Sequence, residues 1–257
     1  MRCAAFSFGM VLGVQLAVPP VSVAADLETI QARGYLVVAV RDGWRPLGYR
    51  DESGNLVGLE IDIARQLADV ILDDPNAVVF EVVPNRDRLQ AVLEDRVDVA
   101  IAGVTLTPDR MRLVRFSPPY YLDGTGILVP GGDEVPELAD LRLSRIGLLQ
   151  GSSAISSLRY VLPLADLVPL GSYQEAYAGL NGGQLDAFAG DISVLIGWQQ
   201  EYPGYRLVPE ALSADPLAIV MPKGNQYDDL HRLVYDAVDT WHDQGWLEDR
   251  ATYWGLP

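Results

Sequence analysis

The chain has 257 residues, of which 49% are hydrophobic and 21% charged, and its formal net charge is −16 at pH 7. This composition is typical of a globular protein and excludes a disordered chain. So strong an acidic balance argues against nucleic acid and anionic membranes as partners. The length suffices for one large domain or for two lobes of ordinary size.

The N-terminal segment differs from the rest of the chain. Arg2 is the only charge before Asp26, the stretch from Cys3 to Val18 is mostly apolar, and small residues precede Asp26. This pattern predicts a secretory signal peptide over residues 1–25, cut after Ala25, and therefore a protein exported from the cytoplasm. An uncleaved anchor helix is the alternative. After this segment, no apolar run reaches the roughly 18 residues that a membrane span needs.

Short β-rich runs then alternate with helical patterns, which predicts an α/β protein with parallel strands and crossover helices. Strands are expected at 35–40, 78–83, 97–102, 125–130, 146–149, 187–189 and 217–221, with a hairpin over 46–57. Helices are expected at 58–72, 87–94, 154–161, 173–180, from 191, at 226–242 and at 245–253.

Two α/β units joined by two extended connections explain this order. We predict that lobe 1 comprises residues 26–119 and 218–257, that lobe 2 comprises 125–212, and that the hinges lie at about 120–124 and 213–217. Ligands of such folds bind outside the carboxyl ends of the strands. Here that place is the cleft between the lobes.

The most informative motif is Ala-Gly-Val-Thr-Leu-Thr-Pro-Asp-Arg over residues 102–110, which ends an apolar run. Thr107 is expected to cap a helix that begins at Pro108. The layout places backbone groups of Gly103, the hydroxyl of Thr105 and the guanidinium of Arg110 around one point at the end of a strand. An α-amino acid zwitterion needs such a set, because its ammonium requires acceptors and its carboxylate suits a planar fork of donors.

Together with Phe-Ser-Pro-Pro-Tyr-Tyr over residues 116–121, this motif resembles the signature of the periplasmic polar-amino-acid-binding proteins of ABC importers. That family is the bacterial extracellular solute-binding proteins, family 3. The resemblance covers nearly the whole mature chain. It implies a type II periplasmic-binding-protein fold, an amino acid as ligand, an ABC transporter permease as partner, and a monomer without metal or cofactor.

The resemblance also implies roles for residues of both lobes. Arg110, Thr105 and Gly103 would hold the main-chain end of the ligand from lobe 1. Asp191 would pair with the ligand ammonium from lobe 2, and Ser153 would bind the carboxylate. Taken alone, Asp191 is also compatible with a simple helix N-cap, and the turn that contains Ser153 with a helix cap that binds no ligand.

Three further residues bear on specificity. Trp44 stands where the family has an aromatic that covers the aliphatic part of the ligand, although a core tryptophan is the alternative. Arg88 resembles the arginine of an Asn-Arg-Ile segment in glutamate- and aspartate-binding members, and Arg41 falls where those members carry another arginine. The resemblance thus favours an acidic L-amino acid, while other polar amino acids, and solvated surface positions for these arginines, stay open.

The sequence carries no zinc-binding or nucleotide-binding motif. Two other functional classes stay open beside a carrier protein. One is a ligand-sensing module that acts with a membrane receptor. The other is an enzyme similar to cyclohexadienyl dehydratase on the same scaffold, for which Glu60 and Asp191 are the only candidate acids.

Overall fold

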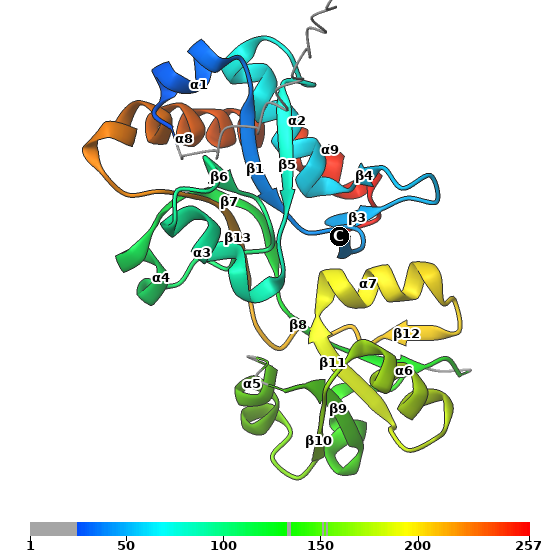
Figure 1. Ribbon diagram of the computed structural model, residues 1–257. Helices are drawn as coiled ribbons and strands as arrows, with labels where there is room; N and C mark the ends of the chain where they lie inside the picture. The colour runs from blue at the N-terminus through cyan, green and yellow to red at the C-terminus, as the bar shows by residue number, and fades with distance from the viewer. Residues whose placement is uncertain (1–24, 133–134, 151, 153) are drawn as a thin grey trace, which may run out of the picture.

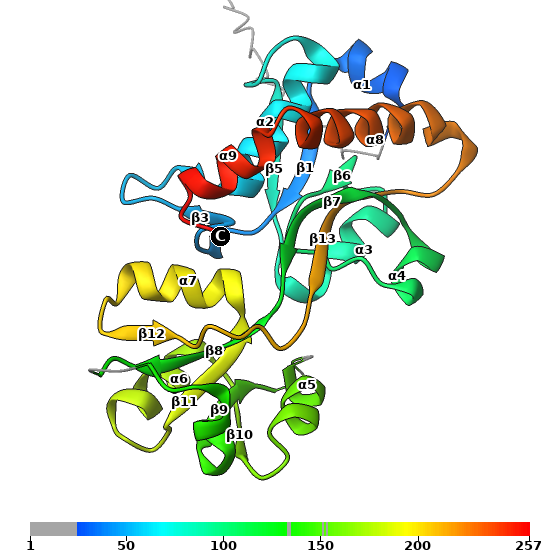
Figure 2. The ribbon, with the colours of Figure 1, turned by 180° about the vertical axis from the view of Figure 1, so that it is seen from behind.

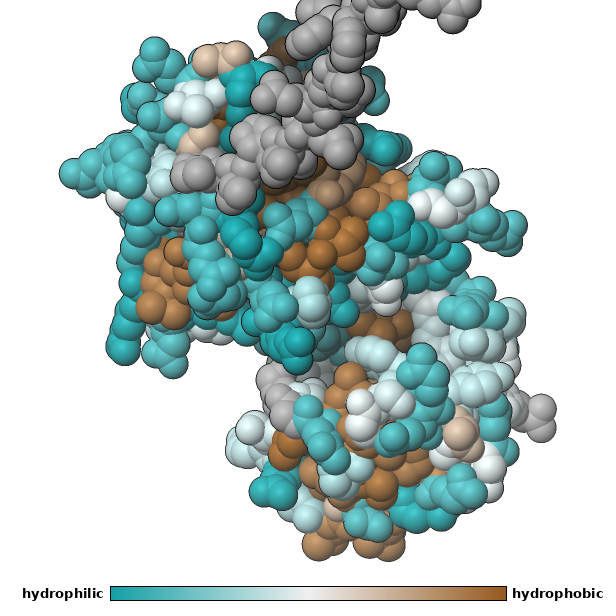
Figure 3. Space-filling view, in the orientation of Figure 1, coloured by the Kyte–Doolittle hydropathy of each residue, from teal (hydrophilic) through white to brown (hydrophobic). Residues whose placement is uncertain are grey.

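The computed structural model describes residues 25–132, 135–150, 152 and 154–257. The predicted signal peptide, apart from Ala25, lies outside these residues. The described chain forms an upper and a lower α/β unit, joined where β7, β8 and β13 pass between them (Figures 1 and 2). Figure 3 shows hydrophilic side chains over much of one face. No helix within the described ranges is both long and apolar enough to cross a membrane.

The upper unit is built on a five-stranded sheet in the order β5-β1-β6-β13-β7. Its strands are β1 (Leu36–Val40), β5 (Val78–Val82), β6 (Val99–Ala100), β7 (Arg115–Asp123) and β13 (Asp215–Met221). Its helices are α1 (Leu27–Arg33), α2 (Leu59–Leu72), η1 (Asn85–Asp87), α3 (Arg88–Leu93), α4 (Pro108–Leu113), η3 (Asn225–Tyr227), α8 (Asp228–Asp243) and α9 (Trp246–Tyr253). A small sheet of β2 (Gly43–Trp44), β3 (Gly48–Arg50) and β4 (Leu56–Val57) completes this unit.

All five residues of β1 are buried, because helices cover both faces of this sheet. Val38 and Val40 pack in one core cluster with residues of α2 and α8, while Val37 and Ala39 pack in another with residues of α3. A continuous apolar strand is typical of a sheet covered on both faces. The predicted face of α2 is buried as expected, and its buried apolar residues are Leu59, Ile61, Ile63, Ala64, Leu67, Ala68 and Ile71.

The lower unit is built on a second five-stranded sheet in the order β10-β9-β11-β8-β12. Its strands are β8 (Thr125–Pro130), β9 (Arg145–Leu149), β10 (Asp166–Leu170), β11 (Ala187–Asp191) and β12 (Tyr205–Leu207). Its helices are η2 (Leu138–Leu143), α5 (Ala154–Val161), α6 (Tyr173–Asn181) and α7 (Ile192–Glu201).

Strand direction differs from the prediction. β1 pairs in parallel with β5 and β6, and β9 pairs in parallel with β10 and β11, as the crossover helices imply. However, β13 is antiparallel to β6 and β7, and β8 is antiparallel to β11 and β12. Since β7 is antiparallel only to β13, and β12 only to β8, β7 and β12 run in the same direction as the other strands of their sheets. The prediction of parallel strands is therefore wrong for β8 and β13. β8 brings the chain into the lower unit and β13 returns it to the upper unit. No crossover helix joins either strand to the strand before it in the chain, and a parallel neighbour would need one.

The two predicted connections pair with each other. In the ladder of β7 with β13, Asp123 lies opposite Asp215, Leu122 opposite Pro216, and Tyr121 opposite Leu217. The chain therefore passes between the units as a hydrogen-bonded ribbon over most of the predicted hinge residues. The lobe boundaries and the hinge role remain a prediction, which the membership of the two sheets supports.

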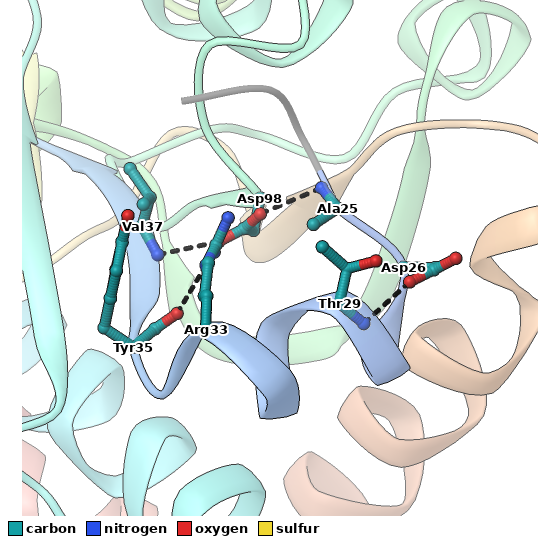
Figure 4. Close-up of polar contacts among 7 residues, drawn as sticks. All are labelled: Ala25, Asp26, Thr29, Arg33, Tyr35, Val37 and Asp98. Carbon is teal, nitrogen blue, oxygen red and sulfur yellow. Dashed lines mark hydrogen bonds and ion pairs between the residues drawn. The ribbon is translucent and has the colours of Figure 1, made fainter. Parts of the chain in front are cut away.

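The N-terminal helix α1 is anchored by a buried carboxylate (Figure 4). Asp98 accepts hydrogen bonds from the backbone N–H of Ala25 at 3.0 Å and of Val37 at 2.7 Å, and it pairs with the guanidinium of Arg33. The side chain of Asp98 is fully buried. Asp98 therefore ties α1 and β1 to the start of β6.

We expect Asp98→Ala to lower the free energy of unfolding by about 3 kcal/mol, because it leaves a largely buried guanidinium and a buried N–H without an acceptor. Urea unfolding followed by circular dichroism measures this loss. Asp109→Ala is the control, since Asp109 is 91% exposed and its pair with Arg112 lies at the surface. Equal effects of the two substitutions would contradict the anchoring role.

Candidate functional site

A cavity of about 750 Å³ lies between the two units. Arg41 follows β1, Gly103 follows β6, Gln150 follows β9 and Asp191 ends β11, and all four line this cavity. The cavity thus lies at the carboxyl ends of parallel strands from both sheets, where ligands bind in open α/β sheets.

Most of the predicted site residues meet at this cavity although they are far apart in the sequence. Its lining includes Arg41, Trp44, Arg88, Gly103, Thr105, Arg110 and Asp191. Ser153 lies outside the described residues, and its neighbours Gln150 and Ser152 line the cavity. Within the described ranges, no group of three or more His, Cys, Asp or Glu side chains is arranged to hold a metal ion.

Arg110 lies in the first turn of α4, and this helix places it at the cavity. Thr107 caps α4, as predicted, and its side chain accepts from the N–H of Arg110 at 3.4 Å. Nη1 of Arg110 donates to the carbonyl of Thr105 at 2.8 Å. Burial lowers the pKa of Arg110. The guanidinium is therefore partly removed from water and oriented by one bond, and its other donors are unbonded among the described residues.

Gly103 has both of its backbone polar groups engaged within the protein. Its N–H donates to Oε1 of Glu60 at 2.6 Å, and its carbonyl accepts from Nη1 of Arg88. Its φ of 64° lies in the left-handed region, and a Cβ there would overlap the ring of Trp44. Glycine is thus required at this position. It also offers a ligand fewer free backbone groups than the sequence predicted.

Arg88 has a structural role that the sequence did not indicate. Its Nε donates to the carbonyl of Asn85 at 2.9 Å, and its Nη1 donates to the carbonyls of Ala102, at 2.7 Å, and Gly103. Burial, together with the charges of Arg41 and Arg110, lowers the pKa of Arg88 to about 10. Arg88 therefore holds the end of the β6 segment in place, and its contact with a ligand stays a prediction.

Trp44 belongs both to the core and to the cavity wall. Only 7% of it is exposed, and it packs in the main core cluster of the upper unit. The guanidinium of Arg41 lies 4.7 Å from the centre of its ring, and Nη1 of Arg41 donates to Oδ1 of Asn85 at 2.9 Å. Arg41 therefore covers part of the aromatic surface that the ligand was predicted to contact.

Asp191 occupies the N-cap position of α7, but its side chain makes no capping hydrogen bond. Simple capping therefore does not account for this carboxylate. Burial, together with the charges of nearby Asp123 and Asp215, raises the pKa of Asp191 to about 6, while Arg88 and Arg41 oppose this rise. The carboxylate thus faces the cavity in a setting that favours a cationic partner.

The sequence did not assign Asp123 and Asp215 to the site. They lie opposite each other in the β7–β13 ladder, and both line the cavity. Asp123 accepts from the N–H and hydroxyl of Ser193 at 3.1 and 2.5 Å, and Asp215 accepts from the hydroxyl of Ser213 at 2.7 Å. Like charges directly opposite each other destabilise a strand pair. An acidic residue in each predicted connection was the signal that could have found them.

The helix that begins after Asp191 also contacts the upper unit. Ile196 of α7 is buried in the main core cluster of that unit, and a Cβ at Gly197 would overlap the carbonyl oxygen of Arg45. Nε2 of Gln200 donates to the carbonyl of Trp254 at 3.0 Å. These contacts hold α7 against the upper unit. Asp191, at the start of α7, therefore lines the same cavity as Arg110 of the upper unit.

The two sheets, their strand order and the cavity between them define a two-lobed, type II periplasmic-binding-protein fold. Residues 36–257 match the bacterial extracellular solute-binding proteins, family 3. The chain belongs to this family, and the resemblance found in its sequence is confirmed.

Relatives and solved structures agree with this assignment. The chain is 32% identical over 195 residues to a glutamine-binding protein of Geobacillus stearothermophilus, which covers 75% of this chain and 74% of that protein. It is 27% identical over 233 residues to the L-cystine-binding protein TcyJ of Escherichia coli, which covers 89% and 85%. A solved ancestral arginine-binding protein bound to glutamine superposes with a TM-score of 0.69 at 29% identity, covering 86% of this chain and 98% of that one.

We expect Asp191→Asn to stabilise the unliganded protein at pH 8 and much less at pH 4.5. The folded pKa of about 6 lies above the ordinary value of 3.8, so ionising Asp191 destabilises the fold as pH rises through this range. The gain at pH 8 is about 3 kcal/mol at most. Urea unfolding at the two pH values measures it, with exposed Asp109→Asn as the control. A gain that is equal at both pH values would contradict this account.

Proposed function

We propose that this protein captures a free L-amino acid outside the cytoplasm and delivers it to the permease of an ABC importer. The observation that carries the proposal is one cavity with opposite charges on its walls. Its guanidiniums include those of Arg41, Arg88 and Arg110, and its carboxylates include those of Asp123, Asp191 and Asp215. The names of its relatives support the same class of ligand, since they are glutamine-, cystine- and glutamate-binding proteins.

In this proposal, Arg110 binds the α-carboxylate of the ligand through two hydrogen bonds. The Thr105 hydroxyl completes this half-site with the Gly103 carbonyl, which accepts from Arg88 and has a second lone pair. Asp191 binds the α-ammonium from the other unit, and Ser153 adds a donor to the carboxylate. A zwitterion that bridges Arg110 and Asp191 satisfies both only when the two walls are close together. The ligand therefore binds the closed state more tightly than the open state, which is the requirement for ligand-driven closure.

We infer that the preferred ligand carries an acidic side chain. Arg41 lies on the cavity wall, and its partners within the described residues are the amide oxygen of Asn85 and the face of Trp44. Neither neutralises its charge, so a second ligand carboxylate would pair with it, assisted by Arg88. A neutral side chain would leave the guanidinium partly desolvated without a counter-ion, which is unfavourable.

A carrier is favoured over a dehydratase by the position of the candidate acids. Glu60 is fully buried and lies behind Gly103, so it does not reach a substrate in the cavity. Asp191 is then the remaining acid, and in our proposal it is occupied by the ligand ammonium. We propose that the carrier acts as a monomer in the periplasm after removal of its signal peptide. A sensing module would use the same site and differ only in its membrane partner.

The proposed function is tested by a thermal-shift screen of the common amino acids. A true ligand at 100 times its dissociation constant stabilises the protein by about 2.7 kcal/mol. We expect glutamate or aspartate to give the largest shift. Arg110→Ala should weaken binding of that ligand by at least about 2 kcal/mol in calorimetry, because the α-carboxylate loses its charged partner.

Arg112→Ala is the matched control for Arg110→Ala. Arg112 lies two residues further along α4, is 80% exposed in its side chain, and does not line the cavity. Its removal should leave affinity unchanged. Binding that survives Arg110→Ala intact, or a wild-type protein that no amino acid stabilises, would refute the proposal.

Arg41→Met tests the preference for an acidic side chain. We expect it to weaken glutamate at least about tenfold more than glutamine, since a charge-assisted pair is lost only for glutamate. Arg45→Met is the control, because Arg45 also lines the cavity but stacks on Tyr49 at 4.2 Å. It should affect both ligands alike. Equal losses in Arg41→Met would remove Arg41 from the selective role.

A further inference from the structure

A buried acid behind the cavity remains unexplained by ligand contacts. Glu60 lies in the first turn of α2, is fully buried, and does not line the cavity. Its Oε1 accepts two hydrogen bonds, from the N–H of Gly103 at 2.6 Å and from the hydroxyl of Tyr120 at 2.6 Å. Its Oε2 is buried without a partner among the described residues. Such a side chain is costly to bury unless its contacts serve a purpose.

The contacts of Glu60 converge on a single peptide of the cavity wall. The N–H of Gly103 is held by Glu60, and the carbonyl of Gly103 is held by Arg88, which also holds the carbonyl of Ala102. The ring of Trp44 packs directly against Gly103. One buried acceptor thus fixes the segment against which Trp44 and Arg88 are placed.

The surroundings of Glu60 change the pKa of its carboxyl in opposite directions. Burial raises the pKa of Glu60, while its bond from Tyr120, its bond from Gly103, and the charges of Arg41 and Arg88 oppose this rise. Neither arginine forms an ion pair with it within the described residues. Both donors meet Oε1, so a proton on the unpartnered Oε2 would cost no hydrogen bond.

We propose that Glu60 is a positioning residue of the binding site, which acts as a hydrogen-bond acceptor that holds the Gly103 peptide and, through it, the cavity faces of Arg88 and Trp44. The effect on amino-acid binding rests on the proposed function, whereas the hydrogen bond between Gly103 and Glu60 does not. Without the acceptor, the Gly103 N–H would be stranded in the core, and the permissive glycine backbone would turn to find another partner. The wall would then adopt its binding geometry for only part of the time.

The expected effect on affinity follows from the fraction of molecules in which the Gly103 segment has its binding geometry. A ligand that binds only the competent geometry has its dissociation constant raised by the reciprocal of the competent population, whatever its side chain. Loss of Glu60 should therefore weaken glutamate and glutamine by the same factor. This result differs from that expected for Arg41→Met, which should weaken glutamate more than glutamine.

The test compares Glu60→Gln with Glu60→Met. Glutamine keeps an oxygen where Gly103 and Tyr120 donate, so we expect both ligands to bind within about threefold of wild type in calorimetry. Methionine keeps similar volume but has no oxygen acceptor, so we expect both affinities to fall about tenfold or more. Unchanged binding in Glu60→Met, or an equal loss in Glu60→Gln, would overturn the acceptor role.

Tyr120→Phe is the matched control, because it removes the second donor to Oε1 and leaves the Gly103 contact in place. We expect a lower melting temperature and affinities within about threefold of wild type. This variant also keeps the proposal testable if Glu60→Met fails to fold. A loss of affinity in Tyr120→Phe as large as the tenfold expected for Glu60→Met would show a general packing role instead and overturn the inference.

A measurement without ligand separates this inference from the proposed function. We expect the Gly103 amide hydrogen, followed by NMR exchange in the unliganded protein, to stay protected in Glu60→Gln and to exchange at least about tenfold faster in Glu60→Met. Unchanged exchange in Glu60→Met would overturn the inference even if amino acids bind. Failure of the wild-type protein to bind any amino acid would overturn the proposed function while leaving this result standing.

Discussion

Guanidiniums and carboxylates face each other across one cavity, and no ion pair among the described residues joins the two sets. Arg88 and Arg110 donate to backbone carbonyls, and Arg41 donates to an amide oxygen. Asp191 makes no capping bond, although it occupies an N-cap position. Partly buried charges without counter-ions are unfavourable, and a bound zwitterion would supply a partner to each wall. The connection between the units and the contacts of α7 set how far apart these charges lie.

The connection between the units sets the distance between the charges on the two sides of the cavity. Two antiparallel strands carry the chain between the units, and the facing carboxylates of Asp123 and Asp215 stand within this ribbon. A second contact lies on α7, where Ile196 joins the core of the upper unit and Gly197 meets the backbone of Arg45. Asp191 stands at the start of the same helix. Any change in the relative position of the units therefore moves this carboxylate with respect to Arg110.

Hydrogen bonds within the protein fix the part of the cavity wall that the upper unit provides. Arg88 holds the carbonyls of Ala102 and Gly103, while Glu60 holds the N–H of Gly103 from the core. A buried hydrogen-bond network of this kind restricts a segment to one geometry, since each lost partner strands another group. The binding surface is thus prepared in advance, and less conformational entropy is lost when a ligand arrives.

The sequence by itself determined the strand and helix segments that depend on local periodicity, such as β1 and α2, and the Thr107 cap that presents Arg110. Most of the candidate site residues that it indicated line the cavity, because family motifs mark the ends of strands. Only the tertiary structure decided strand direction, which depends on how the chain returns between the units. Only it paired Asp123 with Asp215, which are distant in the chain and meet across two strands. Likewise, Glu60 finds its partners 43 and 60 residues away, and no local pattern encodes contacts between segments so far apart.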